Sequence, residues 1–232
     1  MKWRGVSEKT VAASPVDVPL KQRLTDIKAG IAQYVRPDNQ AINERSIQEL
    51  RDSGIAQQML PVGAKAPEFT LPDQHGKPVS SAELLSKGPL VISFFRGRWC
   101  PFCVAEIETW RDRSLQIQAA VASLVAISPM QVRHNFFMAD QHKLGFPVLS
   151  DSANHVARKF GLVYRVPEYQ KQLYRSVFVN LSHLNGDESW ELPLPATYVI
   201  DGNRTVLYAF ASTNYMERAE PEDVIAELRA RI

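Results

Sequence analysis

From residue 90 onward, segments typical of buried strands alternate with segments typical of helices. Residues 90–95 are predominantly apolar, β-branched and aromatic, and residues 103–120 follow with apolar side chains at helical intervals. The same order continues with strands at 122–128 and 147–149, helices at 131–144 and 152–160, a hairpin within 196–210 and a last helix from Pro221. This alternation predicts an α/β fold with a parallel or mixed central sheet flanked by helices.

The part of the chain before this alternation has a different character. Apolar residues at helical intervals predict one helix that ends at Pro37 and a second over about 40–51, after an irregular tail at 1–16. Two prolines and a glycine within residues 61–67 then break any helix. We therefore expect an N-terminal helical extension at 1–60 and one domain at 61–232.

A further segment, between Val163 and Pro195, interrupts the pattern before the final hairpin. Its apolar residues Tyr169, Leu173, Val177 and Leu181 follow a helical spacing. We expect a helical insertion here whose aromatic and apolar stripe belongs to the core rather than to a binding surface.

The two cysteines of the chain, Cys100 and Cys103, lie at the predicted junction of strand and helix. On a helix, residues three positions apart share one face, which brings the two thiols within reach of a disulfide. Pro101 suits the first helical position, so the helix is expected to start directly after Cys100. The unpaired amides of a helix N-terminus favour a thiolate, and Arg96 and Arg98 add positive charge nearby. Cys100 is therefore the expected exposed nucleophile, with Cys103 as its resolving partner.

Three other uses of the cysteines compete with redox chemistry. Both could be ordinary small core residues, although a position at a helix start argues against this. A zinc site would need a second pair of ligands, and the five histidines show no ligand spacing. Haem attachment requires a histidine directly after the second cysteine, where this chain has Val104. No metal or cofactor is therefore expected.

Composition limits the partners and the compartment. A formal net charge of +2 does not favour nucleic acid or an acidic membrane surface as a partner. No apolar run reaches the roughly 18 residues of a membrane span, and the first residues lack the apolar core of a signal peptide. A cytoplasmic location follows as an expectation. In that reducing compartment a close cysteine pair is more often catalytic or metal-binding than structural.

Several segments, in the correct order, resemble the peroxiredoxin-like branch of the alkyl hydroperoxide reductase C/thiol-specific antioxidant family, within the thioredoxin-like superfamily. The similar segments are residues 62–73, 76–79, 94–106, 125–128 and 196–201. The resemblance implies a thioredoxin-like fold over about 61–232 and leaves the first 60 residues unexplained.

The departures from the family pattern concern the reactive residues. Aligned on the family motif, Cys103 takes the place of the peroxidatic cysteine, Arg96 that of the motif proline and Cys100 that of its threonine. The family arginine before the last hairpin is replaced by Pro195, which resembles the cis-proline of thioredoxins and precedes Thr197 by two residues. The Cys-Pro-Phe-Cys sequence is itself similar to the Cys-Pro-Tyr-Cys of glutaredoxins.

The resemblance and the thiol pair together predict a thiol-dependent peroxidase that reduces hydroperoxides. Its substrate would be a hydroperoxide or a disulfide, its reductant an external thiol (thioredoxin, glutaredoxin or glutathione), and the family analogy adds a homodimer. Arg96, Arg98 and Arg175 are the candidates to stabilise the departing oxygen, and Trp99, Pro101, Pro195 and Thr197 are further supporting residues. Two alternatives stay open at this point, a disulfide oxidoreductase without peroxidase activity and a non-catalytic redox-sensing module.

Overall fold

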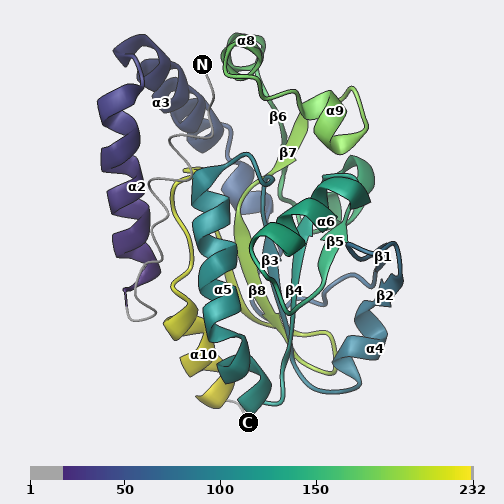
Figure 1. Cartoon of the computed structure of the whole chain (residues 1–232). Helices are drawn as coiled ribbons and strands as arrows, with labels where there is room; N and C mark the ends of the chain where they lie inside the picture. Colours follow the sequence, from purple (N-terminus) through teal and green to yellow (C-terminus); the bar gives the residue numbers. More distant parts are fainter. Residues whose placement is uncertain (1–17, 231–232) are drawn as a thin grey trace.

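The apolar run after residue 89 forms β3 (Leu90–Phe94), all of which is buried, in the middle of a five-stranded sheet. The strand order is β5-β4-β3-β8-β9. β4 (Ser123–Ser128) and β5 (Val148–Ser150) run parallel to β3. β8 (Ala196–Ile200) is antiparallel to β3, and β9 (Val206–Ala211) is antiparallel to β8. Helices lie on both faces of this sheet (Figure 1). The predicted mixed sheet with flanking helices is therefore confirmed.

The computed structural model describes residues 18–230, so the tail expected at residues 1–16 lies outside the described range. The helices that flank the sheet are α4 (Ser81–Leu85), α5 (Pro101–Ala119), α6 (Val132–Gln141), α7 (His155–Lys159) and α10 (Pro221–Ala230). Two further antiparallel pairs are β1 (Thr70–Pro72) with β2 (Pro78–Ser80), and β6 (Val163–Arg165) with β7 (Glu191–Pro193). The short turns η1 (Ile55–Gln58) and η2 (Ser152–Asn154) are 3-10 helices.

Alternation along β3 divides its side chains between two apolar clusters. Val91 packs with residues of α5 and α10, while Leu90, Ile92 and Phe94 pack with residues of α4 and α7. This division is expected because successive side chains of a strand point to opposite faces. Ser93 follows the same alternation but is polar, and its hydroxyl hydrogen-bonds to Glu106 of α5.

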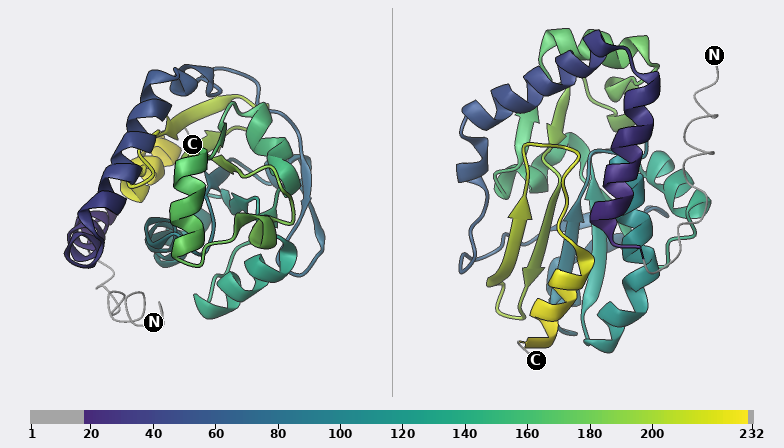
Figure 2. Two further views of the ribbon diagram at one scale, coloured as in Figure 1. Left: turned by 90° about the horizontal axis from the view of Figure 1, so that it is seen from above. Right: turned by 90° about the vertical axis from the view of Figure 1, so that its left-hand side faces the viewer.

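The first 60 residues contain the two predicted helices, α2 (Leu20–Tyr34) and α3 (Pro37–Asp52). α3 begins at Pro37, three residues earlier than predicted. Proline suits the first position of a helix, so Pro37 starts α3 instead of lying in a loop between the two helices. α2 packs along α5, and α3 lies beside α8 (Glu168–Ser176) at one end of the molecule (Figure 2). The extension is thus in direct contact with the domain that follows it.

The predicted insertion differs from the expectation in two ways. Its helical stripe is divided into α8 and α9 (Leu181–Asn185), because Phe178 adopts a left-handed φ of 63° between them. The ends of the insertion are strands rather than loops, since β6 pairs with β7 in register Val163↔Pro193. These strands are three residues long, which is too short for alternation to reveal them.

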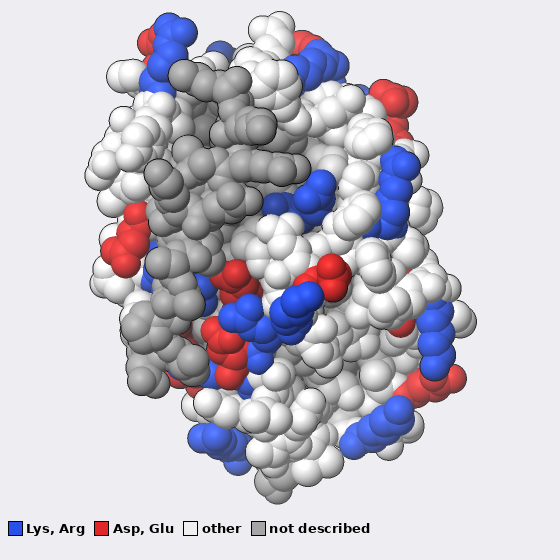
Figure 3. Space-filling view, in the orientation of Figure 1, with Lys and Arg blue, Asp and Glu red and all other residues white. Residues whose placement is uncertain are grey.

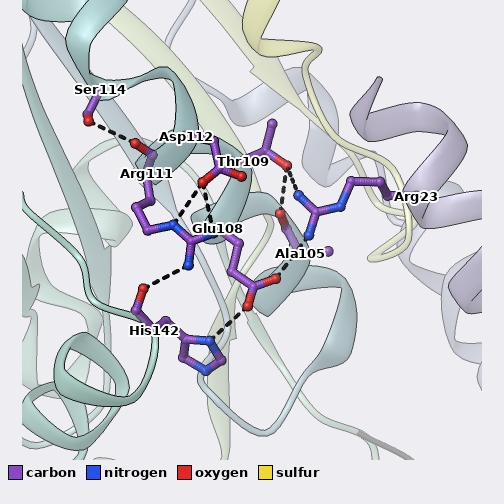
Figure 4. Close-up of polar contacts among 8 residues, drawn as sticks. All are labelled: Arg23, Ala105, Glu108, Thr109, Arg111, Asp112, Ser114 and His142. Carbon is purple, nitrogen blue, oxygen red and sulfur yellow. Dashed lines mark hydrogen bonds and ion pairs between the residues drawn. The ribbon is translucent and has the colours of Figure 1, made fainter. Parts of the chain in front are cut away.

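A group of polar side chains fastens α2 to α5 (Figure 4). The carboxylate of Glu108 lies 2.9 Å from an Nη of Arg23 and 3.0 Å from Nδ1 of His142. The other Nη of Arg23 donates to the Thr109 hydroxyl at 2.6 Å. Both members of the Arg23–Glu108 pair are about nine-tenths buried. Enclosed ion pairs of this kind depend on both partners being present.

The surface carries charges of both signs. On the face shown in Figure 3, lysine and arginine are interspersed with aspartate and glutamate, in keeping with the formal net charge of +2. Within residues 18–230, no helix combines the length and the apolar content that crossing a bilayer requires.

Replacing Glu108 tests the attachment of α2. Burial opposes the charge of Glu108, but its hydrogen bond with His142 and the charge of Arg23 outweigh this and lower its pKa. A carboxylate with a lowered pKa stabilises the fold above its ordinary titration range, and this contribution is lost as the pH falls. We expect Glu108→Ala to lower the free energy of unfolding by about 1.5–3 kcal/mol at neutral pH, with a smaller difference in acid.

The measurement is urea unfolding of both proteins at several pH values, with Glu44→Ala at an exposed position of α3 as the control. Equal stability of the Glu108 variant and the wild type at neutral pH would contradict a role for this carboxylate in holding α2.

Candidate active site

The cysteine pair lies where the carboxyl end of β3 meets the amino end of α5. Cys100 is the N-cap residue and Pro101 the first helical residue, as predicted. The loop between strand and helix is tight: the Cys100 amide donates to the Gly97 carbonyl at 3.1 Å. Gly97 has φ of 147°, and a Cβ there would lie 2.5 Å from Nε1 of Trp99, so only glycine fits. Helix geometry thus places the sulfur of Cys100 beside unpaired amides.

Both cysteines are free thiols, and both are buried. Their exposed fractions are 2% for Cys100 and 0% for Cys103. The expectation that Cys100 is exposed is therefore wrong. The two sulfurs are nevertheless neighbours, since the Cys103 thiol is a hydrogen-bond partner of Cys100. The sequence gives no signal for this burial, because the covering side chains come from segments distant in the chain.

Arg96 is the first of two buried arginines at the pair, with an exposed fraction of 1%. One Nη lies 3.9 Å from the Cys100 sulfur, and the other donates to the Tyr174 hydroxyl. Aromatic rings enclose the guanidinium, with centroids 4.4 Å away for Tyr215 and 4.7 Å for Trp99. Among residues 18–230, no carboxylate forms an ion pair with Arg96. Arg96 instead contacts weaker acids, the Tyr174 hydroxyl and the Cys100 thiol, and of these two the thiol ionises more readily.

Arg218 is the second buried arginine, and sequence reasoning missed it. Its Nη2 lies 3.1 Å from the Cys103 sulfur, and its Nε pairs with the carboxylate of Glu106. The Ser93 hydroxyl donates to the other oxygen of Glu106 at 3.0 Å. Arg218 lies in the loop between β9 and α10, 115 residues from Cys103. No local sequence pattern marks Arg218. Glu106, one helical turn after Cys103, is indicated only as the last residue of the 94–106 segment that resembles the family.

The charges around the pair favour one thiolate. Two arginines face a single carboxylate, so one further negative charge balances the group. Burial alone would raise the pKa of Cys100, but the hydrogen bond from Cys103 and the charges of Arg96 and Arg218 lower it to about 5. Burial and the neighbouring thiolate instead raise the pKa of Cys103. Burial also raises the pKa of Glu106 to about 7 despite Arg218.

The structure places the other predicted residues in three settings. Trp99 and Pro101 belong to the site, as described above. Pro195 and Thr197 are buried beside it, because β8 pairs with β3 in register Ser93↔Thr197. The Leu194–Pro195 peptide bond is trans rather than cis, and the Thr197 hydroxyl finds no hydrogen-bond partner within residues 18–230.

The remaining two arginines lie elsewhere. The side chain of Arg98 is exposed, and only its backbone amide contacts a site neighbour, the sulfur of Met130. Arg175 is on the surface of α8, where it pairs with Glu168 at 3.5 Å and lies over the Trp190 ring. Neither contacts a cysteine.

A metal site gains no support from the arrangement of side chains. Within residues 18–230, no three or more His, Cys, Asp or Glu side chains come together in a way that would hold a metal ion. The thiols instead have arginines as their partners, which is a setting for anionic sulfur chemistry.

Comparison with known proteins agrees with the fold. The model of the AhpC/TSA family matches residues 62–209. A provisionally named peroxiredoxin of Mycobacterium tuberculosis is 31% identical over 168 residues, which is 72% of this chain and 96% of that protein. The chain belongs to the AhpC/TSA family. It is therefore a peroxiredoxin-like enzyme of the thiol-dependent peroxidase class, as predicted.

Two further relatives place it within that family. The chloroplastic peroxiredoxin Q of Sedum lineare is 34% identical over 100 residues, covering 43% of this chain and 53% of that protein. The crystal structure of the peroxidoxin BcpB of Mycobacterium tuberculosis aligns with a TM-score of 0.59 at 28% identity, over 74% of this chain and 97% of that one. The family match begins at residue 62 and ends at residue 209. The helices α2 and α3 therefore lie before it, and Arg218 lies after it.

The ionisation of Cys100 can be followed directly through the ultraviolet absorbance of its thiolate. We expect the wild type to titrate with a pKa of about 5, a signal that Cys100→Ser removes. Arg96→Leu should raise this pKa, because the substitution removes the cation nearest to the sulfur. Arg98→Leu, at an exposed arginine two residues away, is the matched control and should leave the titration unchanged. A pKa equal to the wild type's in Arg96→Leu would show that Arg96 does not stabilise the thiolate.

Proposed function

We propose that Cys100 is the attacking thiolate of this peroxidase and that Cys103 is the resolving thiol. The observation that carries the proposal is the position of the Cys100 sulfur, at the N-terminus of α5 and beside Arg96, which pairs with no carboxylate of the described part of the chain. A lowered pKa makes Cys100 the anionic member of the pair at neutral pH.

The first step is the reduction of a hydroperoxide. The Cys100 thiolate attacks the terminal oxygen of the hydroperoxide, the O–O bond breaks, and the departing alkoxide or hydroxide takes up a proton. Cys100 is thereby oxidised to a sulfenic acid, and the product is an alcohol or water. Arg96 is the cation beside the reacting sulfur, and it would stabilise the charge that develops on the leaving oxygen.

The second step closes the disulfide. The Cys103 sulfur attacks the sulfenic sulfur of Cys100, an S–S bond forms, and water leaves with the proton of the Cys103 thiol. Arg218 lies 3.1 Å from the Cys103 sulfur and would stabilise it as it loses that proton. An external dithiol then reduces the disulfide through a mixed-disulfide intermediate.

The family alignment supports the opposite assignment, in which Cys103 attacks the peroxide. The contact of Cys103 with Arg218 agrees with that alternative, because an arginine beside the reactive sulfur is the family feature. Against it stand the raised pKa of Cys103 and its position inside the helix. The two assignments use the same residues and differ in which sulfur becomes a sulfenic acid.

Membership of the family supports the class of substrate and of reductant, but not their identities. A hydroperoxide substrate and a thioredoxin-type reductant are supported by membership of the peroxiredoxins, while glutaredoxin and glutathione are further candidates as reductants. The homodimer and the cytoplasmic location stay predictions. A disulfide oxidoreductase is the second candidate function, favoured by the Cys-Pro-Phe-Cys sequence at a helix start and disfavoured by the burial of both sulfurs.

Turnover and trapping separate these assignments. We expect the reduced protein to consume hydrogen peroxide when thioredoxin and its reductase recycle it, and Cys100→Ser to lower the rate by more than about a thousandfold. In Cys103→Ser, a sulfenic acid should accumulate on Cys100, where dimedone labelling and peptide mass spectrometry detect it. A sulfenic acid on Cys103 of the Cys100→Ser variant, formed at the wild-type rate, would reverse the roles. Absence of turnover with every thiol donor would leave disulfide exchange or sensing.

A further inference from the structure

One helix of the N-terminal extension and one helix of the insertion lie together over the end of the domain where α5 begins. α3 belongs to the N-terminal extension, and α8 belongs to the insertion between β6 and β7 (Figures 1 and 2). Both helices lie at the carboxyl edge of the parallel strands, which is the edge that carries Cys100. We call this pair of helices the lid.

The two helices of the lid are joined through buried and half-buried polar contacts. The Ser46 hydroxyl of α3 donates to Oε1 of Gln170 at 2.9 Å, and Gln170 is 1% exposed. The amide nitrogen of Gln170 reaches the Asn43 side chain at 3.3 Å. Nearer the surface, the Tyr169 hydroxyl donates to Glu49 at 2.5 Å. A buried amide whose hydrogen bonds cross this contact fixes the position of α8 against α3.

Tyr174 connects the lid to the thiol site. It lies on the inner side of α8 with an exposed fraction of 6%, and its ring contacts Trp99 with centroids 5.2 Å apart. Its hydroxyl accepts a hydrogen bond from the same guanidinium that reaches Cys100. Burial and the neighbouring phenols and thiols keep the pKa of Tyr174 above its ordinary value, so the hydroxyl is neutral at all relevant pH values. Arg96 is thus held between Tyr174 on one side and the Cys100 sulfur on the other.

The closed lid leaves almost no room at the reacting sulfur, since Cys100 is 2% exposed. We propose that the lid makes this enzyme selective for small hydroperoxides, of which hydrogen peroxide is the smallest, and that Tyr174 is the specificity-determining residue. Hydroperoxides with a bulky substituent and disulfides of folded proteins are excluded from the dithiol state. This inference rests on the proposed role of Cys100 as the attacking sulfur.

The selection acts on the reduced enzyme, and a protein reductant is compatible with it. Disulfide formation converts the Cys100 thiolate into a neutral sulfur, so Arg96 loses the anion that holds it on one side. Tyr174 then keeps its hydrogen bond to a guanidinium that is no longer fixed at the cysteine. The lid is accordingly expected to be tightest in the dithiol state, which is the state that meets the hydroperoxide.

The experiment compares kcat/KM for hydrogen peroxide with that for cumene hydroperoxide, which carries an aromatic ring. We expect the wild type to prefer hydrogen peroxide, and Tyr174→Ala to raise the ratio of cumene hydroperoxide to hydrogen peroxide by about tenfold or more, since steric exclusion from a pocket has effects of this size. Tyr174→Phe keeps the ring and should keep the wild-type ratio. Tyr34→Ala, at a tyrosine that is 73% exposed on α2, is the matched control.

Gln170→Ala is a second variant that loosens α8 from α3 without touching Arg96. It should change the ratio in the same direction as Tyr174→Ala, and it keeps the test decisive if Tyr174→Ala does not fold. A wild type that prefers cumene hydroperoxide, or an unchanged ratio in the folded variants, would overturn the proposal.

A measurement without peroxide separates the failure of this proposal from the failure of the proposed function. Alkylation of the reduced thiols by small iodoacetamide and by a maleimide carrying a bulky fluorophore reports access alone. We expect the ratio of bulky to small reagent rates to be low in the wild type and to rise in Tyr174→Ala and Gln170→Ala. Equal ratios in all proteins would remove the lid even if peroxidase activity is present. A shifted ratio without turnover would keep the lid and remove the peroxidase assignment of Cys100.

Discussion

The guanidinium of Arg96 against the sulfur of Cys100 is the interaction on which the site depends. A buried cation needs an anion or a network of acceptors, and the surroundings of Arg96 offer aromatic rings, the phenols of Tyr174 and Tyr164, and a thiol. Arg218 has its carboxylate in Glu106. The enclosed group therefore reaches neutrality when one cysteine is ionised, which makes the reactive form of the enzyme also its electrostatically balanced form.

The fold brings this group together by a simple arrangement. The carboxyl ends of parallel strands lie at one edge of the sheet, and the helix that follows β3 presents its N-terminus there. Onto this edge converge α8, which carries Tyr174, and the loop after β9, which carries Arg218. The extension contributes indirectly: α2 lies on α5, and α3 holds α8. Residues before and after the part matched by the family thus complete a site whose centre the family supplies.

Much of this architecture could be predicted from local sequence. Within the central sheet, β3, β4, β8 and β9 are largely apolar runs of five or six residues, and the helices between the strands are periodic. The failures have physical causes. β6 and β7 are three residues each and exist because they pair with each other. The insertion helix is divided at Phe178 by a left-handed residue that no composition rule marks. Arg98 is two residues from Cys100, and Arg175 is on the insertion helix α8, but the side chains of both are exposed to solvent.

By itself the sequence determined the position of the thiol pair: an apolar strand, a glycine-containing loop, a cysteine before a proline and a helix are local features, and local geometry places Cys100 at the helix N-terminus. Only the tertiary structure decided which charges surround the sulfurs and how much solvent reaches them. Arg218 is 115 residues from Cys103, and Tyr174 is 78 residues from Arg96. Contacts over such separations depend on how the layers pack, because the local preferences of each segment would be satisfied in many packings.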